Sequence, residues 1–394
     1  MDLNQTDHLK AYGVAYWILD QGTDVEWLLN YRGGSFTMRS DPSIIRLCRI
    51  RGVQFEILSG TDITSIYQMI ETRNMDVVLL EKAPKIAVYT PPNKQPWDDA
   101  VTMALTYAEI PYKTLFDEEV LQGHLSQYDW LHLHHEDFTG QYGKFYASYR
   151  NAAWYIKQQE LFESEAEKLG FEKVSELKRA VVLTIYNYMT QGGFLFAMCS
   201  ATDTYDIALA SKNTDICDTV FDHDPVDPEY QAKLDFSSCL AFQDFSLYTN
   251  PMVYEYSDID ITPPNQRIPS DASRDYFTLF EFSAKYDPVP TMLTQNHVSV
   301  IHNFMGQTTG YHRHLIKKSV VIMAEKEGTD QVKYIHGNAG QGSFTFLGGH
   351  DPEDYQHFVG DPPTELSLHK NSPGYRLILN NILFPAAKKK KQKT

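Results

Sequence analysis

The chain is poor in cysteine, lacks a long apolar run and has fewer basic than acidic residues. Its four cysteines are scattered and form no CxxC pair, which argues against a disulfide framework or a zinc ribbon. No apolar run reaches the length that would span a bilayer, so we expect no membrane span. The formal net charge of −16 argues against a broad nucleic-acid-binding surface, so we expect no nucleic-acid partner.

The first residues, 1–7, are polar and lack the apolar core of a signal peptide. Cytoplasmic localisation is therefore the default expectation. An exported cell-envelope protein whose leader had been removed would begin in the same way, so that alternative stays open.

The sequence does contain enough apolar material for a large core, since 42% of its 394 residues are hydrophobic. Changes of pattern predict an N-terminal α/β unit at 1–84 and a larger domain at 85–387, followed by a basic disordered tail at 388–394. The larger domain carries an insertion at about 213–295. In the first unit, the spacing predicts strands at 25–31 and 53–58 between helices.

From residue 85 onward, apolar runs of strand length alternate with helical patterns. Strands are predicted at 85–90, 112–115 and 128–134, separated by a helix that begins at Asp98 and a short helix at 117–123. This order is typical of an α/β fold with a doubly wound, mostly parallel, flavodoxin-like sheet. In such a sheet the ligand site lies at the carboxyl ends of the strands.

One stretch, 192–201, has the pattern of a strand that turns sharply into a helix at a nucleophile. An apolar run leads into Cys199, and the small residues Ala197 and Ala201 lie two positions to either side. Small flanking residues are what such a strained turn requires, and a helix N-terminus favours a thiolate. A buried structural cysteine is the competing interpretation.

A second strand-like run, 342–347, leads to Gly348, Gly349 and His350, with Asp351 and Glu353 close behind. A cysteine nucleophile needs an imidazole as base and an acid that orients the imidazole. Cys199, His350 and either Asp351 or Glu353 supply those roles, provided that the two strands run in the same direction.

The loop after the strand at 128–134 is rich in polar groups. We expect His134, His135, Glu136 and Gly140 to line the pocket, and backbone N–H groups there and at Ser200 to stabilise an oxyanion. A metal site at His134, His135 and Glu136, or a solvated loop, are the alternatives. Because the spacing lacks a helical i, i+4 metal motif, we expect neither a metal nor another cofactor.

Two further regions remain ambiguous. The insertion is crowded with aspartates and is interpreted either as solvated or as a cover over Cys199. The histidines that follow it (His297, His302, His312 and His314) have mixed spacing that matches no metal motif.

The order of elbow cysteine and later strand-His-x-x-Glu over residues 85–387 resembles the class I glutamine amidotransferase-like superfamily. The run from Gly342 to Asp351 resembles the closing strand of its ThuA-like members. This resemblance implies a doubly wound fold and a Cys-His pair that cleaves amides.

The full-length pattern (8–13, 30–36 and 135–140) resembles a bacterial family commonly labelled asparagine synthetase B. That label implies an N-terminal cysteine nucleophile and an ATP-pyrophosphatase loop. Asp2 follows Met1 here and the loop is absent from the sequence, so we do not expect ATP-dependent asparagine synthesis.

The sequence therefore predicts a Cys-His hydrolase or amidotransferase-like protein that acts on an amide or related acyl bond of a small molecule or peptide. A non-catalytic binding or scaffold protein that retains the fold is the first alternative. A metal-dependent hydrolase is the second. The sequence does not identify a protein partner.

Overall fold

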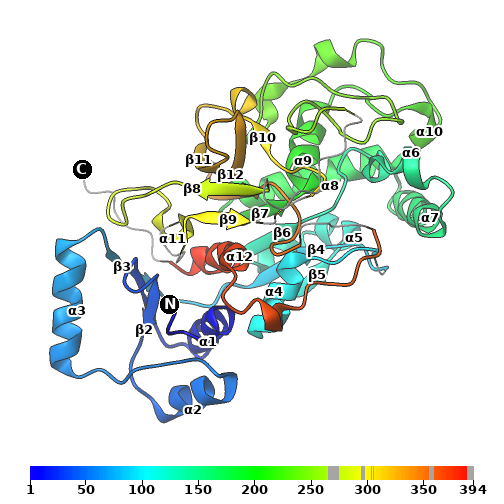
Figure 1. Ribbon diagram of the computed structural model, residues 1–394. Coiled ribbons are helices and arrows are strands. Elements are labelled where there is room, and N and C mark those ends of the chain that lie inside the picture. Colours follow the sequence, from blue (N-terminus) through cyan, green and yellow to red (C-terminus); the bar gives the residue numbers. More distant parts are fainter. Residues whose placement is uncertain are drawn as a thin grey trace.

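The computed structural model describes residues 1–93, 95–264, 275–293, 298–302, 304, 306–354 and 359–387. The expected basic tail at 388–394 and His297 lie outside these residues. The described chain forms a small sheet near the N-terminus and a large sheet covered by helices (Figure 1). Within the part of the chain that the structure describes, no helix is both long and apolar enough to cross a bilayer.

The small sheet is antiparallel, with strand order β2-β1-β3. The segment at 53–58, predicted as a strand, has no regular secondary structure, and the third strand is formed later in the chain. The elements of this part are α1 (His8–Asp20), β1 (Val25–Leu29), β2 (Ser35–Thr37), α2 (Pro42–Arg51), α3 (Gly60–Thr72) and β3 (Asp76–Leu80).

The large sheet has the order β5-β4-β6-β7-β13-β12-β11-β8-β9, and β10 pairs with β12. Its strands are β4 (Ile86–Tyr89), β5 (Lys113–Leu115), β6 (Trp130–Leu133), β7 (Phe194–Met198), β8 (Tyr276–Leu279), β9 (Val300–His302), β10 (Tyr311–His312), β11 (Val321–Glu325), β12 (Gln331–Ala339) and β13 (Gly342–Leu347).

The prediction of a doubly wound, mostly parallel, flavodoxin-like sheet is wrong. Strands β5, β4, β6, β7 and β13 pair in parallel, but every described pairing from β13 through β12, β11 and β8 to β9 is antiparallel. The physical reason is the tight connection between β12 and β13, where Gly340 has a φ of 59°. A turn this short joins antiparallel strands, whereas parallel neighbours need a crossover of a dozen residues or more.

Helices cover both faces of the large sheet. The buried side chains of α4 and α12 share one core with those of α1, while α8 and α9 contribute to the core on the other face. The helices of this part are α4 (Ala100–Ala108), α5 (Asp117–Leu121), α6 (Tyr146–Tyr149), α7 (Ala153–Lys168), α8 (Val174–Thr190), α9 (Ser200–Ala210), α10 (Thr219–Asp222), α11 (Pro290–Leu293) and α12 (Pro373–Leu383).

Strand β7 lies inside the sheet and is buried along its whole length. Phe194, Phe196 and Met198 enter one core, and Leu195 and Ala197 enter the other. This alternation follows from the two-residue period of a strand. The packing on both faces fixes the orientation of β7 about its own axis, so Cys199, which follows Met198, has a defined position at the sheet edge.

Candidate functional site

The candidate site lies where β6, β7 and β13 end. Strand β7 pairs in parallel with β6 on one side and with β13 on the other, so the carboxyl ends of all three meet at one edge of the sheet. The backbone N–H of Cys199 donates to the carbonyl of Gly349 (3.1 Å), and the N–H of Ala201 donates to the carbonyl of His134 (3.1 Å). The turns after the three strands are therefore tied together.

Cys199 has an unusual backbone conformation for a non-glycine residue, with φ 51° and ψ −139°. Its flanking residues Ala197 and Ala201 are fully buried, and their small side chains allow the sharp turn from β7 into α9 to pack without a clash. Such strain costs about 1–3 kcal/mol and persists at sites where the surrounding structure enforces it.

The Cys199 thiol is enclosed, with the residue only 2% exposed. Burial raises the pKa of the thiol to about 11, although hydrogen bonds from the backbone amides of Thr308, Gln307 and Ser200 act in the opposite direction. The thiol is therefore neutral in the resting protein near pH 7. The same three amides are suitably placed to stabilise a negative charge that forms beside the sulfur.

Residues of the predicted insertion lie close to this thiol. Burial raises the pKa of Tyr256 well above its ordinary value, and Cys199 is among the neighbouring groups that add to the shift. Gln307 bridges the two flanking loops, since its side-chain amide donates to the carbonyls of Gly143 (2.9 Å) and Tyr254 (3.4 Å). This part of the insertion thus belongs to the surroundings of Cys199.

A carboxyl group also lies beside the thiol. Asp203, one turn into α9, is 1% exposed, and its Oδ1 accepts a hydrogen bond from the hydroxyl of Thr308 (3.0 Å). Burial raises the pKa of Asp203 to about 7. The sequence gives no signal for this position, because an aspartate in the first turn of a helix is explained by its favourable interaction with the helix N-terminus.

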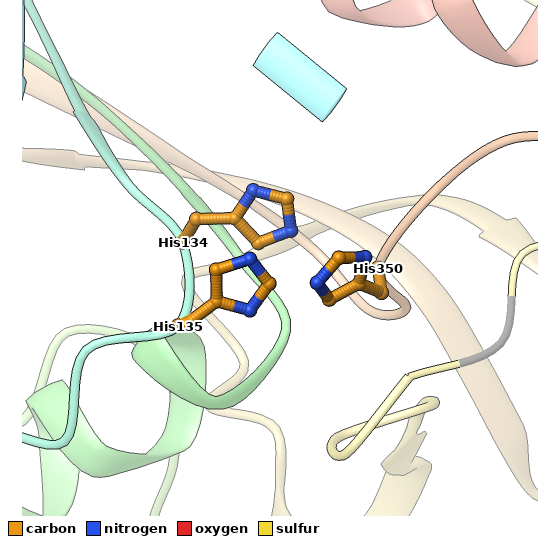
Figure 2. Close-up of side chains that lie close together, drawn as sticks. All are labelled: His134, His135 and His350. Carbon is orange, nitrogen blue, oxygen red and sulfur yellow. The ribbon is translucent and has the colours of Figure 1, made fainter. Parts of the chain in front are cut away.

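The three histidines at the sheet edge form one cluster, hereafter the histidine cluster: His134, His135 and His350 (Figure 2). The ring centroids lie 3.9 Å apart for His134 and His135, 4.0 Å for His135 and His350, and 4.5 Å for His134 and His350. Two protonated rings at such a distance would repel each other by about 4 kcal/mol at an effective dielectric constant of 20. The packing therefore favours neutral imidazoles or a shared cation.

Each ring of the histidine cluster has an oxygen atom at one of its nitrogens. Nδ1 of His350 lies 2.7 Å from Oδ2 of Asp351, and Nδ1 of His134 lies 3.3 Å from Oδ2 of Asp99. Nε2 of His135 lies 2.8 Å from the carbonyl oxygen of Asp98. Each ring therefore has a carboxylate or carbonyl oxygen within 3.3 Å of one of its nitrogens.

The carboxyl groups around the cluster influence one another. Burial, followed by the neighbouring carboxyls of Asp98 and Asp99, raises the pKa of Asp351 well above its ordinary value. Burial also acts to raise the pKa of Asp99, but His132 and His134 outweigh it and hold that pKa well below the usual range. The carboxyl of Asp99 is therefore the one that favours the charged form, whereas Asp351 keeps its proton to higher pH.

The other predicted site residues are placed as follows. The carboxylate of Glu136 accepts a hydrogen bond from the backbone N–H of His134 (2.8 Å), and burial raises its pKa to about 7. Glu353 lies 3.4 Å from Nδ1 of His369, so Asp351 is the acid beside His350. Gly140 has a φ of 85°, and a side chain there would collide with Ser175 of α8. Ser200 opens α9.

A cavity of about 380 Å³ adjoins the histidine cluster. His135, Glu136, Asp98 and Asp99 lie in its wall together with apolar side chains. Among these, Trp97 contacts the ring of His135, with the centroids 5.4 Å apart and the ring planes tilted by 51°. Asp98 and Asp99 were missed as site residues because the sequence explains them as the start of α4, where Asp99 does cap the N–H of Thr102 (2.7 Å).

The later histidines do not join this cluster in the described structure. His312 and His314 lie near Asp330, at 2.7 and 3.3 Å, and are partly exposed. His302 ends β9.

Neither a family model nor a curated protein matches this chain. Two cytoplasmic proteins of Salmonella typhimurium are 10% and 9% identical, with TM-scores of 0.36 and 0.35 over 77% of this chain and 100% of each of theirs. A GH42 β-galactosidase is 9% identical, with a TM-score of 0.30 over 79% of this chain and 32% of that chain. At these TM-scores the likenesses support no conclusion about fold or function, and the resemblance to the amidotransferase-like superfamily remains a prediction.

Proposed function

We propose that this protein is a hydrolase in which Cys199 attacks an amide or related acyl bond. The observation that carries the proposal is the strained backbone at Cys199, with φ 51°, at the sheet edge where the turns after β6, β7 and β13 are tied together. Strain of this kind on a non-glycine residue is found at functional sites more often than elsewhere. A purely structural cysteine would gain nothing from it.

The chemistry follows from the groups at the sheet edge. His350, oriented by Asp351, accepts the thiol proton as the sulfur bonds to the carbonyl carbon. The carbonyl oxygen takes up the negative charge, and the amides of Ser200, Gln307 and Thr308 are the candidate donors to it. The C–N bond then breaks, and His350 returns the proton to the leaving amine.

The resulting thioester is cleaved by water in the same way. His350 takes one proton from the water as its oxygen bonds to the acyl carbon, the C–S bond breaks, and the proton returns to the sulfur. The products are a carboxylic acid and an amine. Because the resting thiol has a raised pKa, proton removal must accompany attack, which makes the base indispensable.

The proposed substrate is a small molecule or a peptide with an amide bond, and the proposed location is the cytoplasm. The cavity beside His135 has a volume suited to such a ligand, and its described lining includes His135 and Glu136 but not Cys199 or His350. ATP-dependent asparagine synthesis is not part of the proposal, since the sequence lacks a pyrophosphatase loop.

The test is a screen of chromogenic amides and esters with the wild-type chain, Cys199→Ala and the matched control Cys48→Ala. Cys48 is also buried but lies on α2, in the N-terminal unit. We expect Cys199→Ala to lose at least a thousandfold in kcat/KM and Cys48→Ala to retain it. Mass spectrometry of wild type quenched in acid should detect an acyl group on the peptide that contains Cys199. Undiminished turnover by Cys199→Ala would reject the proposal.

A further inference from the structure

We infer that His134, His135 and His350 bind one divalent transition-metal ion of the Zn²⁺ type, and that the bound ion inhibits the thiol chemistry by occupying His350. The binding stands independently of the proposed function, whereas the inhibition rests on it.

The distances fit a metal site after small side-chain movements. One ligand atom from each of the three histidines lies within 4.8 Å of the others. Tetrahedral zinc with Zn–N bonds of about 2.1 Å requires nitrogens roughly 3.4 Å apart. The rings come from two separate turns, at the ends of β6 and β13, which the hydrogen bonds of Cys199 and Ala201 hold together.

The second contacts of the rings have the pattern that metal-bound histidines show. A ligating imidazole almost always directs its other nitrogen to a carboxylate or a backbone carbonyl, which fixes the ring and raises its basicity. Asp351, Asp99 and the carbonyl of Asp98 fill these positions for His350, His134 and His135. Three rings with three such partners are hard to attribute to packing alone.

The surroundings of the rings also suit a cation. Oxygen atoms of Asp98, Asp99 and Asp351 lie next to the imidazoles. His135, Asp98 and Asp99 also line the cavity of about 380 Å³, which provides a route of entry for a hydrated ion. Imidazole nitrogens select zinc, cobalt, nickel or copper over magnesium and calcium.

The position of His350 explains why a bound metal ion would inhibit the proposed reaction of Cys199. Its Nδ1 lies 2.7 Å from Oδ2 of Asp351, so Nε2 is the nitrogen that the proposed reaction uses as base for Cys199. A metal bound through Nε2 takes the lone pair of that nitrogen. Metal occupancy and proton transfer from Cys199 are therefore mutually exclusive.

Binding is tested on the full chain, freed of metal with a chelator, by calorimetry with Zn²⁺ and by the visible absorption of Co²⁺. We expect one tight site and a four-coordinate Co²⁺ spectrum. His135→Gln should weaken binding at least tenfold, and since His135 is only partly buried this variant should fold. Asp99→Asn should weaken binding about tenfold to a hundredfold through the His134 contact.

The matched control is His314→Gln, which removes an exposed histidine near Asp330. It should leave the tight site unchanged, and so should Cys199→Ala. The inference is overturned if the wild type takes up no ion, or if His314→Gln loses the tight site while His135→Gln keeps it.

Inhibition is measured separately, as the loss of hydrolysis when Zn²⁺ is added to the metal-free wild type. Binding without inhibition would overturn the regulatory half, and binding without any hydrolysis would reject the proposed function but keep the site.

Discussion

At the scale of single residues, position relative to a strand end is what the sequence predicts well. Cys199 and His350 were placed after strands on local patterns alone, and both follow strands that the structure pairs in parallel. The sequence did not predict Asp98, Asp99 and Asp203 as site residues, because an aspartate at the start of a helix is already explained by helix capping. Their proximity to the site depends on which strands are neighbours, and a local pattern does not contain that information.

The strain at Cys199 leads to a first prediction. Glycine adopts positive φ without a steric penalty, whereas alanine does not, so Cys199→Gly should be more stable than Cys199→Ala by about 0.5–1 kcal/mol. Urea unfolding of the two variants measures the difference. As a control within α9, Ala208→Gly should instead lower the stability, because its backbone is helical. Equal stability of the two Cys199 variants would mean that the turn relaxes at no cost.

Asp203 leads to a second prediction, about pH. Its folded pKa of about 7 lies above the unfolded value near 3.9, so the native state keeps a proton that the unfolded state loses. The stability that this proton provides is fully present below about pH 4 and is lost as the pH rises to 7. Its loss amounts to at most about 1.4 kcal/mol per pH unit.

Asp203→Asn removes this titration but keeps an oxygen for the hydroxyl of Thr308. The difference in unfolding free energy between wild type and variant, measured from pH 4.5 to 8, should therefore shift in favour of the variant as the pH rises. Taking the difference cancels the parallel contributions of Glu136 and Asp206, whose pKa values are also raised. A difference that stays constant with pH would contradict the assignment.

At the scale of elements, helix and strand positions were largely predictable, but pairing was not. Strand β13 was predicted, yet its apolar sequence looks the same whether its neighbours are parallel or antiparallel. The segment at 53–58 shows the reverse error, since Phe55 and Ile57 have strand propensity but find no partner strand and remain exposed. In both cases the deciding contacts are distant in sequence.

A buried ion pair between helices leads to a third prediction. Lys178 of α8 and Asp117 at the start of α5 are 2% and 0% exposed and lie 2.7 Å apart, and Lys178 also donates to the hydroxyl of Tyr89 (2.9 Å). Lys178→Met would leave the Asp117 carboxylate buried without its cation, which costs about 3–5 kcal/mol. Lys168→Met is the control, because its pair with Glu118 is exposed and is worth at most about 1 kcal/mol. If chemical denaturation gave the same loss of unfolding free energy for Lys178→Met and Lys168→Met, this prediction would be contradicted.

At the scale of the whole molecule, the N-terminal part is joined to the rest by a shared core. The hydroxyl of Tyr12 on α1 donates to Asn380 on α12 (2.5 Å), and Arg376 donates to the carbonyl of Gly33 (2.6 Å). The α1 helix also packs closely on α4: a Cβ atom at Gly13 would lie 1.8 Å from the carbonyl oxygen of Ala108. The backbones are in direct contact there, so neither helix can yield without moving the other.

The contact at Gly13 leads to a fourth prediction. Gly13→Ala should destabilise the chain by about 1–3 kcal/mol through overpacking, and calorimetry should show one transition shifted to lower temperature, because both parts lose the same core. Gly60→Ala is the control, since a Cβ atom there would meet nothing within 4 Å. A separate early transition, with the main one unmoved, would show that the N-terminal part unfolds alone.

The parallel pairing of β7 with β13 has a consequence for how the chain is made. Strand β7 and its apolar side chains leave the ribosome long before β13 exists, so one edge of β7 stays uncovered throughout the synthesis of everything between them. The carbonyl of Gly349, which accepts the N–H of Cys199, arrives later still. The nascent protein must therefore carry an open, aggregation-prone strand edge until β13 has been synthesised, and its yield should depend on chaperones that bind such edges.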